Sequence, residues 1–231
     1  MEIGFDVISD LNLEPDDSFN WEGKVTSLYC IVAGNISSDL RTIWQTLLHL
    51  SRLYQGVFYV IGSLEYKDSD DFEATTKSIL KIGSKIHNVA ILQHHVVILD
   101  GLALVGCNGW SNDQKYFDGL YEFRALNNKL EDAKYLKNSI AKLQKHLDVK
   151  KIMVVTSTVP KQELYFGELP DNDDELYLDL CINEDTEMKI TKWVFGTHKK
   201  IVDTTLGNIN YINNPYYHVK PYWAKRVNIE I

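Results

Sequence analysis

The stretch Gly4-Phe5-Asp6-Val7-Ile8-Ser9-Asp10-Leu11-Asn12-Leu13 indicates the fold of this chain. Its first half is largely apolar, and polar and acidic residues follow at once. We therefore expect a buried strand whose carboxyl end carries Asp10. Open α/β sheets bind ligands outside the carboxyl ends of their strands, so Asp10 is expected at the mouth of a pocket.

The same pattern recurs four more times along the chain. Each apolar run is followed by glycine or by small polar residues, which is typical of strands that present side chains at one edge of a sheet. The runs and their endings are 27–33 with Gly34-Asn35, 57–61 with Gly62-Ser63-Leu64-Glu65, 151–155 with Thr156-Ser157-Thr158-Val159-Pro160, and 190–195 with Gly196-Thr197-His198-Lys199. Five strand ends are thus predicted to meet around one pocket.

Apolar residues at helical spacing predict the connections between these strands. Helices are expected from about residue 40 to 51, from 72 to 85, and from 121 to 147, where the apolar stripe includes Leu126, Leu130 and Leu147. Asp100-Gly101 predicts a tight hairpin between strands 96–99 and 102–105, because glycine tolerates positive φ. Further segments are predicted as a strand at 89–92, a short helix at 176–181, and strands of one closing sheet at 188–195, 200–203, 208–212 and 227–231.

Composition places limits on the class of protein. The chain has 231 residues, of which 45% are hydrophobic and 24% charged, as in a soluble globular protein, and we expect a single domain over 1–231. No apolar run approaches the ~20 residues of a membrane span. The N-terminus shows no secretory signal, and Cys30, Cys107 and Cys181 are interpreted as free thiols, so a cytoplasmic location without membrane association is expected. The net charge of −8 argues against nucleic acid as a partner.

The five endings, in this order and at these spacings, resemble those of the calcineurin-like metallophosphoesterases. The resemblance covers nearly the whole chain, including the hairpin, the Trp110 loop, the long helix and Asn214-Pro215 before the last strand. It implies an α/β (α+β) fold, a four-layer αββα sandwich of two mixed β-sheets flanked by helices. In that family the endings carry Asp-x-His, Gly-Asp, Gly-Asn-His-Asp/Glu, a histidine followed by proline, and Gly-His-x-His, which hold two divalent metal ions bridged by an aspartate.

The positions that match the family's metal ligands are largely replaced in this chain. Asp10 keeps the first aspartate, and Glu65 keeps the acid of the third motif. The other positions are Asn12, Leu64, Ser157, Thr197 and Lys199 in place of histidines, Asn35 in place of the bridging aspartate, and Ser63 in place of an asparagine. His198 lies between the last two positions, where alternation would point it to the opposite face. We call these ten residues (10, 12, 35, 63–65, 157 and 197–199) the strand-end set.

The chemistry of these replacements predicts a vestigial pocket without catalytic residues. A neutral amide such as Asn35 is a poor bridge between two cations, and the ammonium of Lys199 would repel a metal ion. No cofactor is therefore expected; at most one ion would bind weakly near Asp10, since Mg²⁺ can use one or two carboxylates. One hypothesis is that Lys199 occupies part of the vacated space and pairs with Asp10, because a partly buried carboxylate without a partner is costly. The alternative is that both side chains are solvated in an open groove.

Three functions remain open at this point. The resemblance implies a catalytically inactive protein of the metallophosphoesterase fold, a pseudoenzyme that acts as a scaffold by binding a protein partner or by self-assembly. The B-subunits of eukaryotic replicative DNA polymerases are relatives of that kind. One alternative is a residual phosphoesterase that uses Asp10, Glu65 and His198, with one weakly held ion. The other is a protein that binds a small phosphate-containing ligand in the vestigial pocket.

Overall fold

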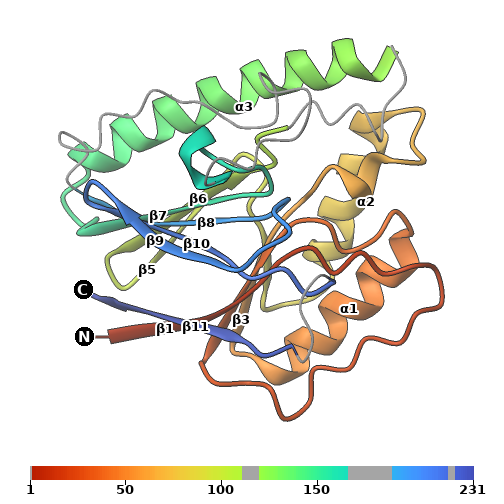
Figure 1. Cartoon of the computed structure of the whole chain (residues 1–231), viewed down its shortest axis with the longest axis horizontal. Coiled ribbons are helices and arrows are strands. Elements are labelled where there is room, and N and C mark those ends of the chain that lie inside the picture. The colour runs from red at the N-terminus through yellow and green to blue at the C-terminus, as the bar shows by residue number, and fades with distance from the viewer. Residues whose placement is uncertain (1, 111–119, 166–188, 218–221) are drawn as a thin grey trace.

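Two β-sheets stack face to face in the computed structural model, and helices cover their outer faces (Figure 1). The structure describes residues 2–110, 120–165, 189–217 and 222–231, with the backbone alone for 120–126. The predicted αββα sandwich of two mixed sheets is thereby confirmed. None of the described helices is long and apolar enough to cross a bilayer.

The first sheet has five strands in the order β11-β1-β2-β3-β4. Its strands are β1 (Glu2–Ile8), β2 (Tyr29–Ala33), β3 (Gly56–Val60), β4 (Val89–Ile91) and β11 (Lys225–Glu230). β1 to β4 run parallel, and the crossovers between β2, β3 and β4 contain α1 (Leu40–Leu53) and α2 (Phe72–Ser84). The short 3₁₀ helix η1 (Leu64–Tyr66) follows β3. Parallel strands place their carboxyl ends at the same edge, so the endings of β1, β2 and β3 come together.

The second sheet has six strands in the order β5-β6-β7-β8-β10-β9. Its strands are β5 (His95–Leu99), β6 (Leu102–Cys107), β7 (Lys151–Thr156), β8 (Ile190–Phe195), β9 (Val202–Leu206) and β10 (Ile209–Asn213). β6, β7 and β8 run parallel, so the endings of β7 and β8 also share one edge. The long helix α3 (Leu120–Lys145) packs on β6, and the 3₁₀ helix η2 (Gln162–Tyr165) follows β7.

Aliphatic and aromatic side chains fill the space between the sheets. The first sheet contributes Phe5, Ile31 and Val60, and the second contributes Leu104 and Met153, all fully buried. Two further cores lie on the outer faces, one beneath α1 and α2 and one beneath α3. Strands buried on both faces explain why the runs that end in the strand-end set are almost continuously apolar.

Most of the predicted elements are confirmed, and two expectations are wrong. Residues 225–230 do not close the second sheet, because β11 pairs antiparallel with β1 in the first. The predicted apolar stripe of α3 is not buried throughout: Leu130, inside the helix, is 63% exposed, and Leu147, beyond the helix, is 96% exposed. The helix predicted at 176–181 and the side chain of Leu126 lie outside the described residues.

Gly106 marks a place where the two sheets approach closely, and it provides a test of this packing. A Cβ at Gly106 would lie 2.7 Å from the carbonyl oxygen of Val155 and 2.9 Å from a methyl group of Val60. We predict that Gly106→Ala lowers the free energy of unfolding by about 2 kcal/mol, because overpacking against backbone cannot relax easily. Gly4→Ala is the matched control in β1, where the nearest atom is a side-chain oxygen at 3.2 Å, so a smaller loss is expected. Equal losses of unfolding free energy for the two variants in urea denaturation would contradict the close approach at Gly106.

Candidate functional site

The side-chain amide of Asn35 connects the endings of four strands. Its Nδ2 donates to Asp10 Oδ1 at 2.8 Å, after β1, and to Thr197 Oγ1 at 3.1 Å, after β8. Its Oδ1 accepts from the backbone N–H of Leu64 at 3.1 Å, after β3. Asn35 itself follows β2 and has a φ of +58°, a left-handed conformation that asparagine tolerates better than most residues. An ionised aspartate here could still accept the bond from Leu64 but could donate neither of the other two.

Asp10 is held by neutral donors on both carboxylate oxygens. It is only 3% exposed, and its Oδ1 accepts from Asn35 and from the backbone N–H of Thr197 at 2.9 Å. Its Oδ2 accepts from Ser9 Oγ at 2.9 Å. Burial raises the pKa of Asp10 to about 6, although the hydrogen bonds from Asn35, Thr197 and Ser9 lower it in part.

The hypothesis that Lys199 pairs with Asp10 is wrong. Lys199 is exposed, and no ion pair between the described residues joins it to Asp10. The hydrogen bonds from Asn35, Thr197 and Ser9 explain the difference, since they satisfy the carboxylate without moving a lysine into a buried position.

Glu65 is buried too, but its carboxylate serves a different set of bonds from that of Asp10. Oε1 accepts from the backbone N–H of Ile36 at 2.7 Å and from Tyr59 Oη at 2.6 Å, and Oε2 accepts from the N–H of Gly62 at 3.0 Å. Burial raises the pKa of Glu65 to about 7, and the bonds from Tyr59, Ile36 and Gly62 lower it in part. Glu65 thus ties the segment after β2 to the end of β3.

The serine positions of the strand-end set are packed inside the protein. Ser157 is fully buried, and a Cβ on Gly34 would lie 2.3 Å from its Oγ, so the serine fills the space beside that glycine. The hydroxyl groups of Ser157 and Ser63 have no hydrogen-bond partner within the described part of the chain.

The remaining positions lie at the margin of this network. Asn12 is half-buried, and its Nδ2 donates to the carbonyl oxygen of Asp10 at 3.3 Å. Leu64 is also half-buried. The ring of His198 packs against those of Tyr165 and Phe195, which belong to the core beneath α3. This placement agrees with the prediction that His198 points away from the other strand endings.

The described residues do not fit a two-metal centre. Among them, no group of three or more histidine, cysteine, aspartate or glutamate side chains is arranged to hold a metal ion. The oxygens of Asp10 and Glu65 face N–H and O–H donors, and a cation near them would meet the hydrogens of Asn35 and Thr197. Because the family chemistry requires electron-pair donors at these places, this arrangement does not supply it.

Sequence reasoning missed a further buried carboxylate near the same edge. Asp132 of α3 accepts from the backbone N–H of Gly109 at 2.7 Å, and its Oδ1 lies 2.5 Å from Nε2 of His94. This contact raises the pKa of His94 above its usual value. The sequence shows Asp132 only as one polar residue of a long helix, because the contact joins residues 38 positions apart.

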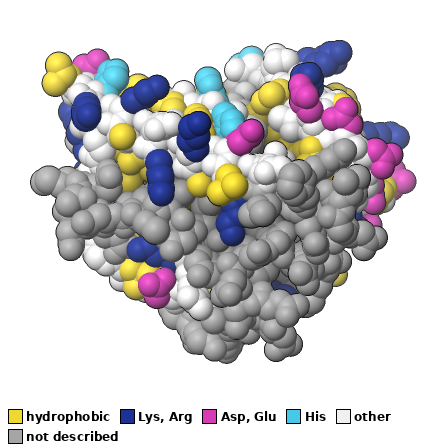
Figure 2. Space-filling view, turned by 90° about the horizontal axis from the view of Figure 1, so that it is seen from above, with side chains coloured by type: hydrophobic (Ala, Val, Ile, Leu, Met, Phe, Trp, Pro, Cys, Tyr) yellow, Lys and Arg dark blue, Asp and Glu magenta, His cyan; other side chains and the backbone are white. Residues whose placement is uncertain are grey.

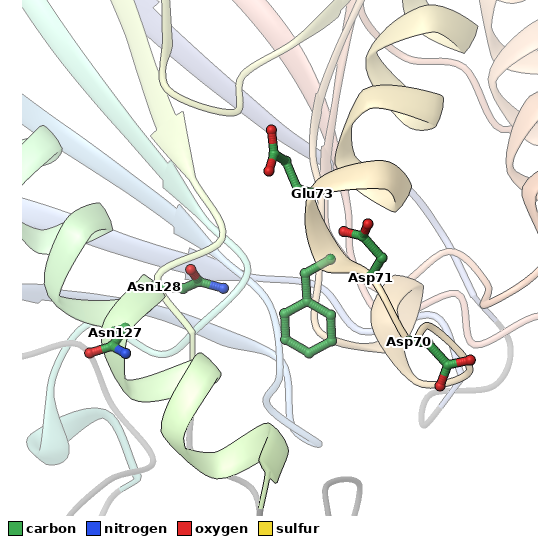
Figure 3. A pocket seen from close by; sticks show the side chains of 6 residues that line it. Asp70, Asp71, Glu73, Asn127 and Asn128 are labelled. Atoms are coloured by element: carbon green, nitrogen blue, oxygen red, sulfur yellow. The ribbon is translucent and has the colours of Figure 1, made fainter.

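A cleft of about 470 Å³ lies between the beginning of α2 and α3 (Figure 3). Asp70, Asp71 and Glu73 line one side, and Asn127 and Asn128 line the other. Two of these acids already have structural roles. Asp71 caps α2 by accepting from the N–H of Ala74, and Glu73 pairs with Lys77 along the helix. Helix capping and an ion pair along α2 therefore account for Asp71 and Glu73 at this cleft.

Comparisons with known proteins agree on the fold. No protein-family model and no curated protein matches the chain. Phosphopantetheinyl hydrolase (PptH) from Mycobacterium tuberculosis superimposes with a TM-score of 0.69 at 15% identity, over 98% of this chain and 96% of that one. TT1561 of Thermus thermophilus does so with a TM-score of 0.60 at 11% identity, over 100% and 99% of the two chains.

A candidate 5′-nucleotidase from Staphylococcus aureus, in complex with alpha-ketoglutarate, gives a TM-score of 0.58 at 10% identity. That match covers all of this chain and 51% of the other. This chain has the metallophosphoesterase fold. The two sheets and their flanking helices are those of this fold, as the sequence resemblance predicted. At these identities the likeness shows the fold alone.

The role of the Asn35 amide can be tested by substitution. Asn35→Asp removes the donor to Asp10 and places a second carboxylate at hydrogen-bond distance from the first. We expect a loss of about 3 kcal/mol in the free energy of unfolding at pH 8 and a smaller loss at pH 5, where one proton can be shared. Asn20→Asp is the matched control, since the side chain of Asn20 acts as an acceptor on the surface. An Asn35→Asp protein as stable as the wild type at pH 8 would refute this role.

The raised pKa of Glu65 predicts a pH dependence of stability. Its value rises from 4.5 to about 7 on folding, so its contribution is fully present below about pH 4.5 and is lost as the pH rises through about 7. The stability of the wild type relative to Glu65→Gln should therefore fall by roughly 3 kcal/mol between pH 4 and pH 8. Glu14→Gln, at an exposed acid, should show no such trend. A difference that stays constant or grows with pH in denaturant titrations would contradict the assignment.

Proposed function

We propose that this protein is a pseudoenzyme of the metallophosphoesterase fold that acts by binding a protein partner. The observation that carries the proposal is the amide of Asn35, which donates to Asp10 where a bridging aspartate would hold two cations. The same amide fixes Thr197 and the backbone of Leu64. The chain thus uses these endings to join strands.

The chemistry of hydrolysis by this fold supports the same interpretation. A two-metal site stabilises both the attacking and the leaving oxygen of the phosphoryl group, and it needs anionic or imidazole ligands around both ions. Here the two retained acids are separated into different networks, because Asp10 bonds to Asn35 while Glu65 bonds to Tyr59 and Ile36. His198 packs into the core beneath α3.

Surface chemistry favours a protein as the partner. In the face of the molecule shown in Figure 2, hydrophobic, acidic and basic side chains are interspersed over the described residues, without a single basic stripe of the kind that binds nucleic acid. The segment before β11 leaves Tyr217 and Trp223 exposed by 60% and 66%. Tyrosine and tryptophan are enriched at protein interfaces, which favours these two side chains as part of a contact surface.

Hydrolysis of a generic phosphodiester, bis(p-nitrophenyl) phosphate, tests the proposal directly. We expect no turnover above the buffer rate with Mn²⁺, Mg²⁺ or Zn²⁺, and no difference between the wild type and Asp10→Asn. Asp16→Asn, at an exposed acid, controls for the change of charge. Metal-dependent turnover that Asp10→Asn abolishes and Asp16→Asn retains would establish a residual phosphoesterase and overturn the proposal.

A further inference from the structure

β5 is an edge strand of the second sheet as far as the structure describes the chain. It pairs antiparallel with β6 and ends the six-stranded sheet, and no strand among the described residues lies on its other side. The register sets Leu99 opposite Leu102 across the two-residue turn, so Leu99, Val97 and His95 exchange hydrogen bonds with β6. The backbone N–H and C=O groups of Val96 and Ile98 therefore point away from the sheet.

Natural proteins commonly protect such edges with charged residues, proline or short strands. Three of the four described sheet edges follow this rule. β4 has only three residues, β9 carries Asp203, and β11 carries Lys225 and Arg226, with Lys225 and Asp203 joined at 2.5 Å. β5 does not follow it: its sequence, His-Val-Val-Ile-Leu, has neither a lysine nor an acid, and Ile98 is 46% exposed.

We propose that β5 pairs antiparallel with β5 of a second copy of this chain, which joins two six-stranded sheets into one continuous sheet. Pairing through the outward backbone groups sets Val96 of one copy opposite Ile98 of the other, with Val97 on the two-fold axis. The proposal specifies a partner for the binding function proposed above.

The ends of the strand favour a second copy in this orientation. β5 begins after His94 and ends before Asp100. Antiparallel pairing about Val97 sets His94 of one copy opposite Asp100 of the other at both ends, so an imidazole, which already contacts Asp132 through Nε2, meets a carboxylate acceptor twice. A parallel partner of the same sequence would bring like groups together.

The helix layer on the α3 side of the sheet is compatible with this dimer. A two-fold axis perpendicular to the sheet places both copies of α3 on the same face. Three strand spacings separate one β6 from the other, or roughly 14 Å, so long side chains of the two helices can approach each other across the joined strands. Val96 already packs against the core beneath α3, which holds β5 in the plane of its sheet.

Sedimentation velocity of the full chain over a wide concentration range tests the proposal. The wild type should show a concentration-dependent dimer. Ile98→Pro removes an outward N–H without breaking a bond to β6, and Ile98→Lys adds a charge to the edge. Each should weaken the dimer by about tenfold or more while leaving the melting temperature within a few degrees of the wild type. Leu80→Lys, at a partly exposed leucine on α2 in the opposite outer layer, is the matched control and should dimerise normally.

Two results would overturn the self-pairing. One is a wild type that stays monomeric throughout, and the other is an Ile98→Lys protein that dimerises as strongly as the wild type. Either result leaves the proposed non-enzymatic function standing, because that function fails only if Asp10→Asn abolishes a metal-dependent hydrolysis. The two ideas therefore fail independently.

Discussion

Four strand endings in this protein are held together by one side-chain amide. Asn35 donates to Asp10 and Thr197 and accepts from the backbone of Leu64, so a single planar group fixes the relative positions of β1, β2, β3 and β8. A parallel sandwich brings these endings to one edge, where side chains from both sheets must be satisfied without much water. In a metalloenzyme of this fold, cations would perform that task. Here an amide performs it.

The surrounding residues also contact the two buried carboxyl groups through neutral N–H and O–H donors. Ser157 fills the space beside Gly34, and Glu65 has become a structural acceptor for Tyr59 and two backbone groups. Burial destabilises the ionised form of an acid, and the hydrogen-bond donors around it offset only part of that effect, so its pKa rises. The raised values of about 6 for Asp10 and about 7 for Glu65 reflect that burial.

Sequence patterns predicted the layers of the fold but not every pairing within it. The apolar runs and the glycines that follow them depend on local chain chemistry and on burial, which is why the strands ending before Asn35 and Thr197 were predictable. β11 was assigned to the wrong sheet, because pairing with β1 joins residues at opposite ends of the chain and leaves no local signal.

At the candidate site too, residue types were informative, whereas contacts between distant residues were not. The residue types alone predict that metal-ligand chemistry is absent, and this stays a prediction. The partner of Asp10 could not be predicted in this way, because the sequence offered Lys199 as the nearest cation, whereas the fold offered three neutral donors that required no buried ammonium. The contact between His94 and Asp132 was invisible for a related reason, since it depends on where α3 crosses the end of β6.

The most direct test of this account is a crystal structure of the protein soaked in Mn²⁺, with anomalous scattering measured at the metal edge. The account predicts no anomalous peak within coordination distance of Asp10, and density in which the Asn35 amide contacts the Asp10 carboxylate. A pair of anomalous peaks bridged at position 35 would contradict it.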